Sequence, residues 1–290
     1  MIKLVTPKDM LIKAKKGQYA IAHFNINNLE WIKSILEVAQ ETKSPVILGA
    51  SVGAIKYMGG YHTVVGMVNN LMNDLNITVP IALHLDHGQK VEQCIAAIDA
   101  GFSSVMFDGS EHDIEENLEL TKQVVAYAKK HHVTVEAEVG SIGGEEDGVI
   151  GNGELAKVDD CLKMKAVGID FLAAGINNIH GPYPSNWTGL KLERLQEISQ
   201  AVNLPLVLHG GSGIDNQQIQ MAIKKGINKI NVNTELQLAF QKAMRHYIET
   251  NQDIKGKGYD PRKLLAPGVL AIKKQAIDLL KEFGSFGQAT

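Results

Sequence analysis

The sequence predicts an α/β fold, a (β/α)8 barrel of the TIM type with additional N- and C-terminal helices. Eight short apolar runs alternate with stretches of helical spacing along the 290 residues, and helices between the runs favour parallel pairing. The runs are too continuous for half-exposed antiparallel strands. One barrel of this type needs about 250 residues, so we expect residues 1–290 to form a single domain. A doubly wound open sheet is the structural alternative, but eight similar units favour closure.

The predicted strands and helices follow one another in regular alternation. Short apolar runs predict strands at 19–24, 45–49, 80–85, 103–107, 133–139, 169–174, 205–208 and 228–232. Between them, polar residues recur on one face and predict helices such as 29–42, 115–130, 190–201 and 214–225. The two extra helices are expected at 7–16 and 267–283. The longest stretches without periodicity are 140–154, 180–188 and 251–262, and long loops of this kind are usually functional.

The composition is that of an ordinary soluble globular protein. The 29 basic and 32 acidic residues are interspersed and give a formal net charge of -3, so no basic face for nucleic acid is implied. No signal-peptide core and no membrane-spanning apolar run is found. Cys94 and Cys161 lack C-x-x-C spacing, which suggests free thiols in a reducing compartment. We therefore expect a cytoplasmic protein without nucleic-acid or membrane partners.

Three histidines fall just past predicted strands, which suggests a metal site. His87, His180 and His209 follow the third, sixth and seventh runs. Strand ends converge at one end of a barrel, and three neutral imidazoles can hold zinc while leaving a fourth position open for catalysis. The alternative is that each histidine is a hydrogen-bonded turn residue beside a glycine. The other seven histidines are expected to be structural.

Acidic residues gather at the same strand ends. A carboxyl group next to a metal can accept or deliver a proton to a reacting oxygen, and the Gly-rich loop at 143–148 could carry a base over the substrate and away again. Alternatives for the loop are a solvated acidic turn and, less well matched in spacing, a calcium loop. The acidic residues concerned are Asp86, Asp108, Glu138, Glu145, Glu146 and Asp147.

Two loops suit the binding of a phosphate group. Residues 209–213 (His-Gly-Gly-Ser-Gly) follow the seventh run and residues 231–234 (Asn-Val-Asn-Thr) follow the eighth. Barrels commonly hold phosphate in these loops, because small residues let backbone N–H groups approach the anion. The alternatives are a flexible turn and a helix N-cap. A dinucleotide-binding fingerprint fails, because Asn216 occupies its third glycine position.

The motif series resembles that of the class II, zinc-dependent fructose-1,6-bisphosphate aldolases along essentially the whole chain. The motifs are His84-Leu85-Asp86-His87-Gly88, Glu136-Ala137-Glu138-Val139-Gly140, Gly143-Gly144-Glu145-Glu146-Asp147-Gly148, Asn178-Ile179-His180-Gly181, His209-Gly210-Gly211-Ser212-Gly213, Asn231-Val232-Asn233-Thr234 and Tyr259-Asp260-Pro261-Arg262. The resemblance implies zinc at His87, His180 and His209. It also implies a second or displaced divalent metal at Asp108 and Glu138, and a monovalent cation (Na+ or K+) that orders the phosphate site.

The activity implied by this resemblance is the reversible aldol cleavage of fructose 1,6-bisphosphate to dihydroxyacetone phosphate and glyceraldehyde 3-phosphate. Zinc would stabilise the enediolate of the dihydroxyacetone phosphate half. Asp86 would take the C4 hydroxyl proton during cleavage, and Glu146 would exchange the proton at C3, with Glu145 as the alternative base. Tagatose-1,6-bisphosphate aldolases differ in C4 stereochemistry and remain a second possibility. A noncatalytic metal or sugar-phosphate binding barrel would not need both Asp86 and Glu146.

The resemblance also assigns the substrate-binding residues. Asn25 and Ser51 would lie near the glyceraldehyde-phosphate half. Arg262 would bind the second phosphate in a neighbouring subunit, which implies a homodimer or homotetramer; the alternative is a surface salt bridge in an ordinary turn. Lys229, the strand lysine, is expected at the wrong end of its strand for Schiff-base chemistry. The first phosphate would be bound by Gly181, Gly210, Gly211, Ser212, Asn231, Val232, Asn233 and Thr234.

Overall fold

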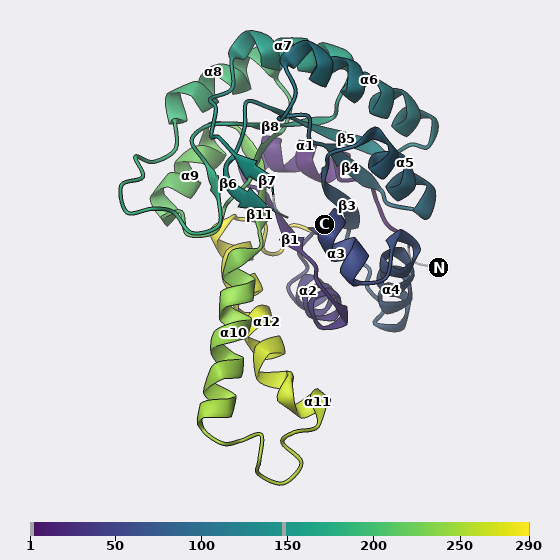
Figure 1. Ribbon diagram of the computed structural model, residues 1–290, viewed down its shortest axis with the longest axis vertical. Helices are drawn as coiled ribbons and strands as arrows, with labels where there is room; N and C mark the ends of the chain where they lie inside the picture. Colours follow the sequence, from purple (N-terminus) through teal and green to yellow (C-terminus); the bar gives the residue numbers. More distant parts are fainter. Residues whose placement is uncertain (1–2, 147–148, 290) are drawn as a thin grey trace.

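The computed structural model describes residues 3–146 and 149–289 and confirms the predicted barrel. In this part of the chain, eight strands pair in parallel and close in the order β1-β11-β10-β8-β5-β4-β3-β2, with helices around the outside (Figure 1). The barrel strands are β1 (Ile21–Asn25), β2 (Val46–Ser51), β3 (Ile81–Gly88), β4 (Ser104–Phe107), β5 (Thr134–Val139), β8 (Phe171–Ala174), β10 (Leu206–Leu208) and β11 (Ile227–Val232).

Helices fill the intervals between the strands, and side-chain caps fix several of their starts. Asn28, Asp113 and Asp215 each accept a hydrogen bond from a backbone N–H in the first turn of the helix that follows, which satisfies a donor that the helix itself cannot. The helices are α1 (Lys8–Gly17), α2 (Leu29–Glu41), α3 (Val52–Tyr57), α4 (Tyr61–Asp74), α5 (Val91–Ala100), α6 (Ile114–Lys130), α7 (Val158–Val167), α8 (Leu192–Val202), α9 (Asn216–Lys224), α10 (Thr234–Glu249), α11 (Pro261–Leu264) and α12 (Ala266–Glu282).

The two extra helices predicted from the sequence are α1 and α12. Met10, Leu11 and Ala14 of α1 join a buried apolar cluster with Ile21 and Phe171 from the barrel strands, so α1 closes the end of the barrel at which the strands begin. Helix α12 packs along α2 and α10. No helix among residues 3–146 and 149–289 combines the length and apolarity needed to span a bilayer.

The interior of the barrel changes from apolar to polar toward the C-terminal ends of its strands. Alternate residues of a strand face the same side, and on β1 the inward-facing residues are Ile21, His23 and Asn25 in that order. On β3 the inward-facing His84 and Asp86 follow the same trend. The intervening residues join the larger cluster under the helices. The sequence pattern therefore delivers buried polar groups to one end of the barrel.

Two stretches expected to be loops carry a small sheet of their own. Strands β6 (Gly143–Glu146) and β7 (Val149–Gly151) pair antiparallel, and β9 (Ile179–His180) pairs in parallel with β6 through Gly143 and Gly144. The prediction that 140–154 lacks regular structure is therefore wrong over these strands. The signal was missed because a strand of two to four Gly-rich residues has no measurable alternation. This sheet connects the acidic loop to the segment that contains His180.

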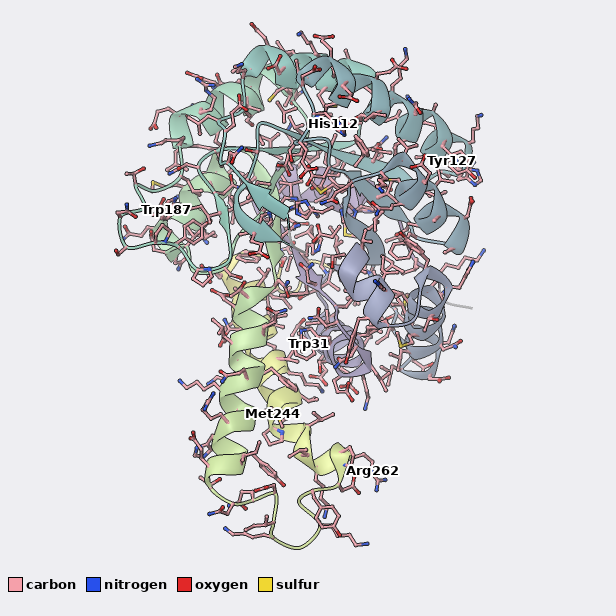
Figure 2. The ribbon with its side chains drawn as sticks, viewed as in Figure 1. Trp31, His112, Tyr127, Trp187, Met244 and Arg262 are labelled. Atoms are coloured by element: carbon pink, nitrogen blue, oxygen red, sulfur yellow. The ribbon has the colours of Figure 1, made fainter. Side chains whose placement is uncertain are left out.

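Helices α10 and α12 project from the barrel as an arm, with α11 at its far end (Figure 1). They pack extensively on each other, but Leu236 is the buried residue of α10, and Leu238 and Ile248 are exposed. Arg262 lies at the end of this arm (Figure 2). Its side chain is 89% exposed. Arg262 therefore lies away from the barrel of its own chain.

Candidate functional site

A polar pocket opens at the C-terminal ends of the barrel strands. It draws on β1, β3, β10, β11 and the segment around β9, so residues far apart in sequence meet there, as barrel geometry requires. Most of the residues predicted for substrate or metal line it. The lining residues are Asn25, Asp86, His180, Gly181, His209, Gly210, Ser212, Asn231, Asn233 and Thr234.

The three predicted ligand histidines meet at this pocket. His87, His180 and His209 each offer a ring nitrogen, and these atoms all lie within 4.8 Å of one another. His209 Nδ1 and His87 Nε2 face each other at 2.9 Å. Two nitrogens bound to one zinc at about 2.0–2.1 Å in tetrahedral geometry lie about 3.3 Å apart. The His87 and His209 nitrogens therefore fit a metal after a shift of a few tenths of an ångström, and a ligand atom of His180 lies within 4.8 Å of both.

His87 reaches this site through an irregular backbone. Its φ of 50° lies in the left-handed region, and the pairing of β3 with β4 shifts register between Leu85 and Gly88. Successive strand residues normally face opposite sides, so a regular strand could not bring both Asp86 and His87 to one pocket. A non-glycine residue in this conformation costs on the order of 1–3 kcal/mol.

Two of the imidazoles are hydrogen-bonded to carboxylates on the side of the ring that faces away from the metal site. His87 Nδ1 lies 2.8 Å from Asp108 Oδ2, and His209 Nε2 lies 2.8 Å from Glu136 Oε1. A carboxylate accepts a hydrogen bond and does not donate one, so each contact places a proton on the nitrogen that faces away from the site. This arrangement leaves Nε2 of His87 and Nδ1 of His209 directed at the centre.

The charges of these two histidines differ. Burial by itself lowers the pKa of His87, but Asp86 and the hydrogen-bonded Asp108 outweigh burial and raise that pKa well above its usual value. Burial, reinforced by the charge of His87, lowers the pKa of His209 to about 4, although the hydrogen bond to Glu136 opposes the change. These opposite shifts make His87 Nε2 the donor and His209 Nδ1 the acceptor in the 2.9 Å contact between the two rings.

Asp86 is ionised and held in place. Asn25 Nδ2 donates to Asp86 Oδ2 at 2.9 Å, and Asn231 Nδ2 donates to Asp86 Oδ1 at 3.2 Å. Burial alone would raise the pKa of Asp86, but nearby His23 and His87, with His209 and Lys229, lower it below the usual range. A buried, oriented carboxylate beside the three imidazoles can take a proton from a bound hydroxyl group.

Asp108 and Glu138 form a second group with His87. One ligand atom of each residue lies within 4.8 Å of the others, and all three line a neighbouring small pocket. Burial, together with the charge of Asp108, raises the pKa of Glu138 well above its usual value. Two carboxyl groups at such a short distance repel each other when both are ionised. A cation between them would therefore be favoured.

The two predicted phosphate loops contribute to the wall of the pocket, whereas Ser51, Gly211 and Val232 are not among its lining residues. Ser51 caps α3 through a hydrogen bond from Ala54 N and is not among the lining residues. Val232 belongs to the buried core, because the residue between inward-facing Asn231 and Asn233 must face outward. Gly211 packs so tightly that an added Cβ would lie 2.5 Å from Ile230 Cγ2. Gly210, Ser212, Asn233 and Thr234 do line the pocket.

Comparison with known proteins gives the same result along the whole chain. Residues 5–288 match the family model described as fructose-bisphosphate aldolase class-II. The chain belongs to this family. It is 53% identical over 289 residues to the fructose-bisphosphate aldolase of Ureaplasma parvum, and 52% identical over 290 residues to that of Geobacillus stearothermophilus, with 99% of each chain covered in both cases. The crystal structure of the YdjI aldolase from Escherichia coli K12 matches with a TM-score of 0.84 at 32% identity, covering 99% of this chain and 100% of that one.

Class II aldolases depend on a metal, and the histidine and carboxylate groups described above could hold one. For the predicted bases Glu145 and Glu146, the structure gives the backbone of both but the side chain of Glu145 alone. Glu145 and Glu146 lie on β6, Glu145 is exposed, and the side chain of Glu146 lies outside the described part of the structure, as do residues 147–148. Strand β6 pairs beside His180, so the backbone of this loop lies next to a predicted metal ligand.

For this family member, the structure corrects the expectation for Lys229. The residue lies in the middle of β11 and is fully buried in the barrel interior, not at the outer end of its strand. Its Nζ donates to Glu136 Oε2 at 2.7 Å. Lys229 therefore lies inside the barrel, and its ammonium group is paired with the carboxylate of Glu136.

Sequence reasoning missed a layer of polar residues directly beneath the pocket. Each lies two positions before a predicted site residue: His23 before Asn25, His84 before Asp86, Glu136 before Glu138 and Lys229 before Asn231. We expected all histidines outside the metal site to be structural, and that expectation does not separate the buried His23 and His84 from exposed histidines such as His131. Strand alternation gives part of the signal, because residues i and i−2 share a face, but it does not show whether that face is the interior of the barrel.

Proposed function

We propose that this chain catalyses the reversible cleavage of fructose 1,6-bisphosphate to dihydroxyacetone phosphate and glyceraldehyde 3-phosphate, with zinc as its metal. The observation that carries the proposal is the convergence of His87, His180 and His209 beside the ionised carboxylate of Asp86. Three imidazoles with an open fourth position suit catalytic zinc. Relatives at about 50% identity named fructose-bisphosphate aldolase support the same substrate. Residues 1–290 are assigned to one domain.

Proton transfer is assigned to two carboxylates. When bound, zinc supplies Lewis-acid stabilisation of the negative charge that cleavage leaves on the dihydroxyacetone phosphate half. Asp86 takes the C4 hydroxyl proton and returns it during condensation, and the hydrogen bonds from Asn25 and Asn231 hold its two oxygens in place. Glu146, on the hairpin beside β9, exchanges the proton at C3. Glu145 is the alternative because it is exposed on the same strand.

The rest of the pocket binds the two ends of the substrate. The small residues and hydroxyl groups of the two phosphate loops, with Gly181, hold the phosphate of the dihydroxyacetone half. Asn25, which lines the pocket, is assigned to the glyceraldehyde-phosphate half, and so is Ser51 at the end of β2, which also caps α3. Asp108 and Glu138 are assigned to a second or displaced divalent metal, which their close approach to His87 supports. A monovalent cation, Na+ or K+, is assigned to the phosphate site.

We assign Arg262 to the second phosphate of a neighbouring subunit. The arm carries it away from its own pocket (Figure 2), and its guanidinium is 89% exposed. In the isolated chain it pairs with Asp260 at 2.7 Å. A guanidinium binds phosphate in a bidentate way and would exchange this exposed pair for a doubly charged partner. The exposed apolar residues of α10 support burial of the arm in a homodimer or homotetramer.

A single set of assays tests the proposal. Rates of cleavage are measured on fructose 1,6-bisphosphate and tagatose 1,6-bisphosphate, before and after chelation and after addition of zinc. We expect turnover on the fructose substrate that chelation abolishes and zinc restores, and no inactivation by borohydride in the presence of substrate. Trapping of substrate on Lys229 would overturn the zinc mechanism, and a faster rate on the tagatose substrate would reassign the substrate.

A further inference from the structure

We infer that Glu136, held by Lys229 inside the barrel, is a positioning residue that turns the Nδ1 atom of His209 toward the metal site. The inference rests on the proposed function, because it assigns the orientation of one of the three metal-binding imidazoles. Glu136 lies below the pocket and has no contact with substrate in this scheme. It acts through His209, and the geometry of three buried side chains carries the argument.

Glu136 makes two short contacts through its two oxygens. Oε1 lies 2.8 Å from His209 Nε2, and Oε2 lies 2.7 Å from Lys229 Nζ. The side chains of all three residues are fully buried. Since a carboxylate can only accept, the hydrogen on His209 must be at Nε2. A neutral imidazole carries one such hydrogen, so Nδ1 has the free lone pair that a metal requires.

Lys229 holds the second oxygen of Glu136. An ammonium group can only donate, and Lys229 Nζ pairs with Glu136 Oε2 at 2.7 Å inside the barrel, which leaves Oε1 for His209. His84 Nε2 also lies 3.3 Å from Glu136 Oε2, and His84 Nδ1 is held by Ser104 Oγ at 2.8 Å. The carboxylate is therefore fixed on several sides.

The two carboxylate-held ligands present opposite nitrogens to the centre. Asp108 holds His87 at Nδ1, which leaves Nε2 for the metal, whereas Glu136 holds His209 at Nε2, which leaves Nδ1. An amide in place of Glu136 could turn its NH2 group toward His209 Nε2 and favour a proton on Nδ1. The metal site would then lose one lone pair without losing any ligand residue.

Three variants separate this role from a general contribution to stability. Glu136→Gln removes the obligate acceptor, Lys229→Met leaves Glu136 as an unpaired buried charge, and the double variant removes both charges. Asp170→Asn is the control, because Asp170 is a carboxylate that likewise accepts a hydrogen bond and pairs with a lysine, although it is less buried than Glu136: it accepts from Val135 N at 3.0 Å and pairs with Lys8 just before β8. It touches none of the residues of the metal site.

Zinc affinity is measured by competition with a chromophoric chelator, thermal unfolding is followed on the metal-free proteins, and the tautomer of His209 is read by nitrogen-15 NMR. We expect the wild-type protein to carry the His209 proton at Nε2. Loss of a group that orients a metal ligand lowers affinity about 10- to 100-fold, so we expect this loss in Glu136→Gln and in the double variant. The double variant should be more heat-stable than Lys229→Met, because no unpaired charge remains.

The outcomes are separable. Wild-type zinc affinity in Glu136→Gln, or a proton on Nδ1 of His209 in the wild-type protein, overturns the inference. It also fails if affinity follows unfolding temperature across the set, with Asp170→Asn weakened in proportion to its stability. None of these measurements uses turnover. A wild-type protein that binds zinc through Nδ1 but cleaves no ketose bisphosphate would overturn the proposed function and leave the inference intact.

Discussion

Replacing Asp86 by asparagine removes a charge and a proton acceptor while keeping almost the same volume. Asp86 is 2% exposed, and its two oxygens accept from Asn25 and Asn231. Losing a positioned proton-transfer group costs about 10²–10⁴ in rate, which corresponds to about 2.7–5.4 kcal/mol of transition-state stabilisation. We therefore expect cleavage of fructose 1,6-bisphosphate to fall by this factor in Asp86→Asn.

The same substitution has a separate, smaller effect on folding. An asparagine side chain offers one oxygen, so one of the two amide donors would face an NH2 group. A buried donor left without an acceptor costs about 1–3 kcal/mol, and the free energy of unfolding should fall by that amount. Metal content should stay at the wild-type level, because the three ligand atoms belong to histidines.

The assay couples product formation to a dehydrogenase, with metal content and urea unfolding measured on the same preparations. Asp99→Asn is the control, since Asp99 is a carboxylate that hydrogen-bonds Tyr127 at an exposed site on α5. It should keep wild-type activity. Activity of Asp86→Asn within a few-fold of wild type, at full metal content, would refute the assignment of Asp86 as the base.

Three further predictions concern the acidic loop, Arg262 and the two buried cysteines. Glu146→Gln should most damage proton exchange on dihydroxyacetone phosphate alone, by about 10²–10⁴; exchange at the wild-type rate would move the role to Glu145. Subunit exchange between inactive Asp86→Ala and weak Arg262→Ala proteins should restore activity in hybrids with one intact site, whereas no recovery after demonstrated exchange would contradict a shared site. Burial raises the pKa of Cys94 above its usual value and that of Cys161 to about 12, so both thiols should resist a thiol reagent until the protein unfolds. Rapid labelling of the native protein would contradict that.

The barrel could be predicted from the sequence because its strands are long enough to show continuous apolar runs. β3 and β11, for example, fall within three residues of their predicted bounds. Convergence of His87 and His209 followed from their shared position at strand ends. His180 was less accessible to this reasoning, since it lies on the two-residue strand β9, several residues beyond β8, and its place depends on pairing with Gly144, 36 residues earlier in the chain.

The polar layer below the pocket could not be found from local sequence alone. His23 or Lys229 in a strand is equally compatible with the outer wall of a sheet, and the inward face is decided by which neighbours close the barrel. The left-handed backbone of His87 was similarly hidden. Its presence depends on the register shift between β3 and β4, which is a property of two strands together.

The pairing of β6 with β9 has a consequence for how this protein can change over evolutionary time. Because side chains alternate along a strand, a one-residue slip between paired strands would send each residue to the opposite face. An insertion in 140–154 that altered this register would therefore displace His180 as well as the acidic hairpin, although the two segments are encoded separately. A graft between relatives that carried one of these segments without the other would therefore disturb both.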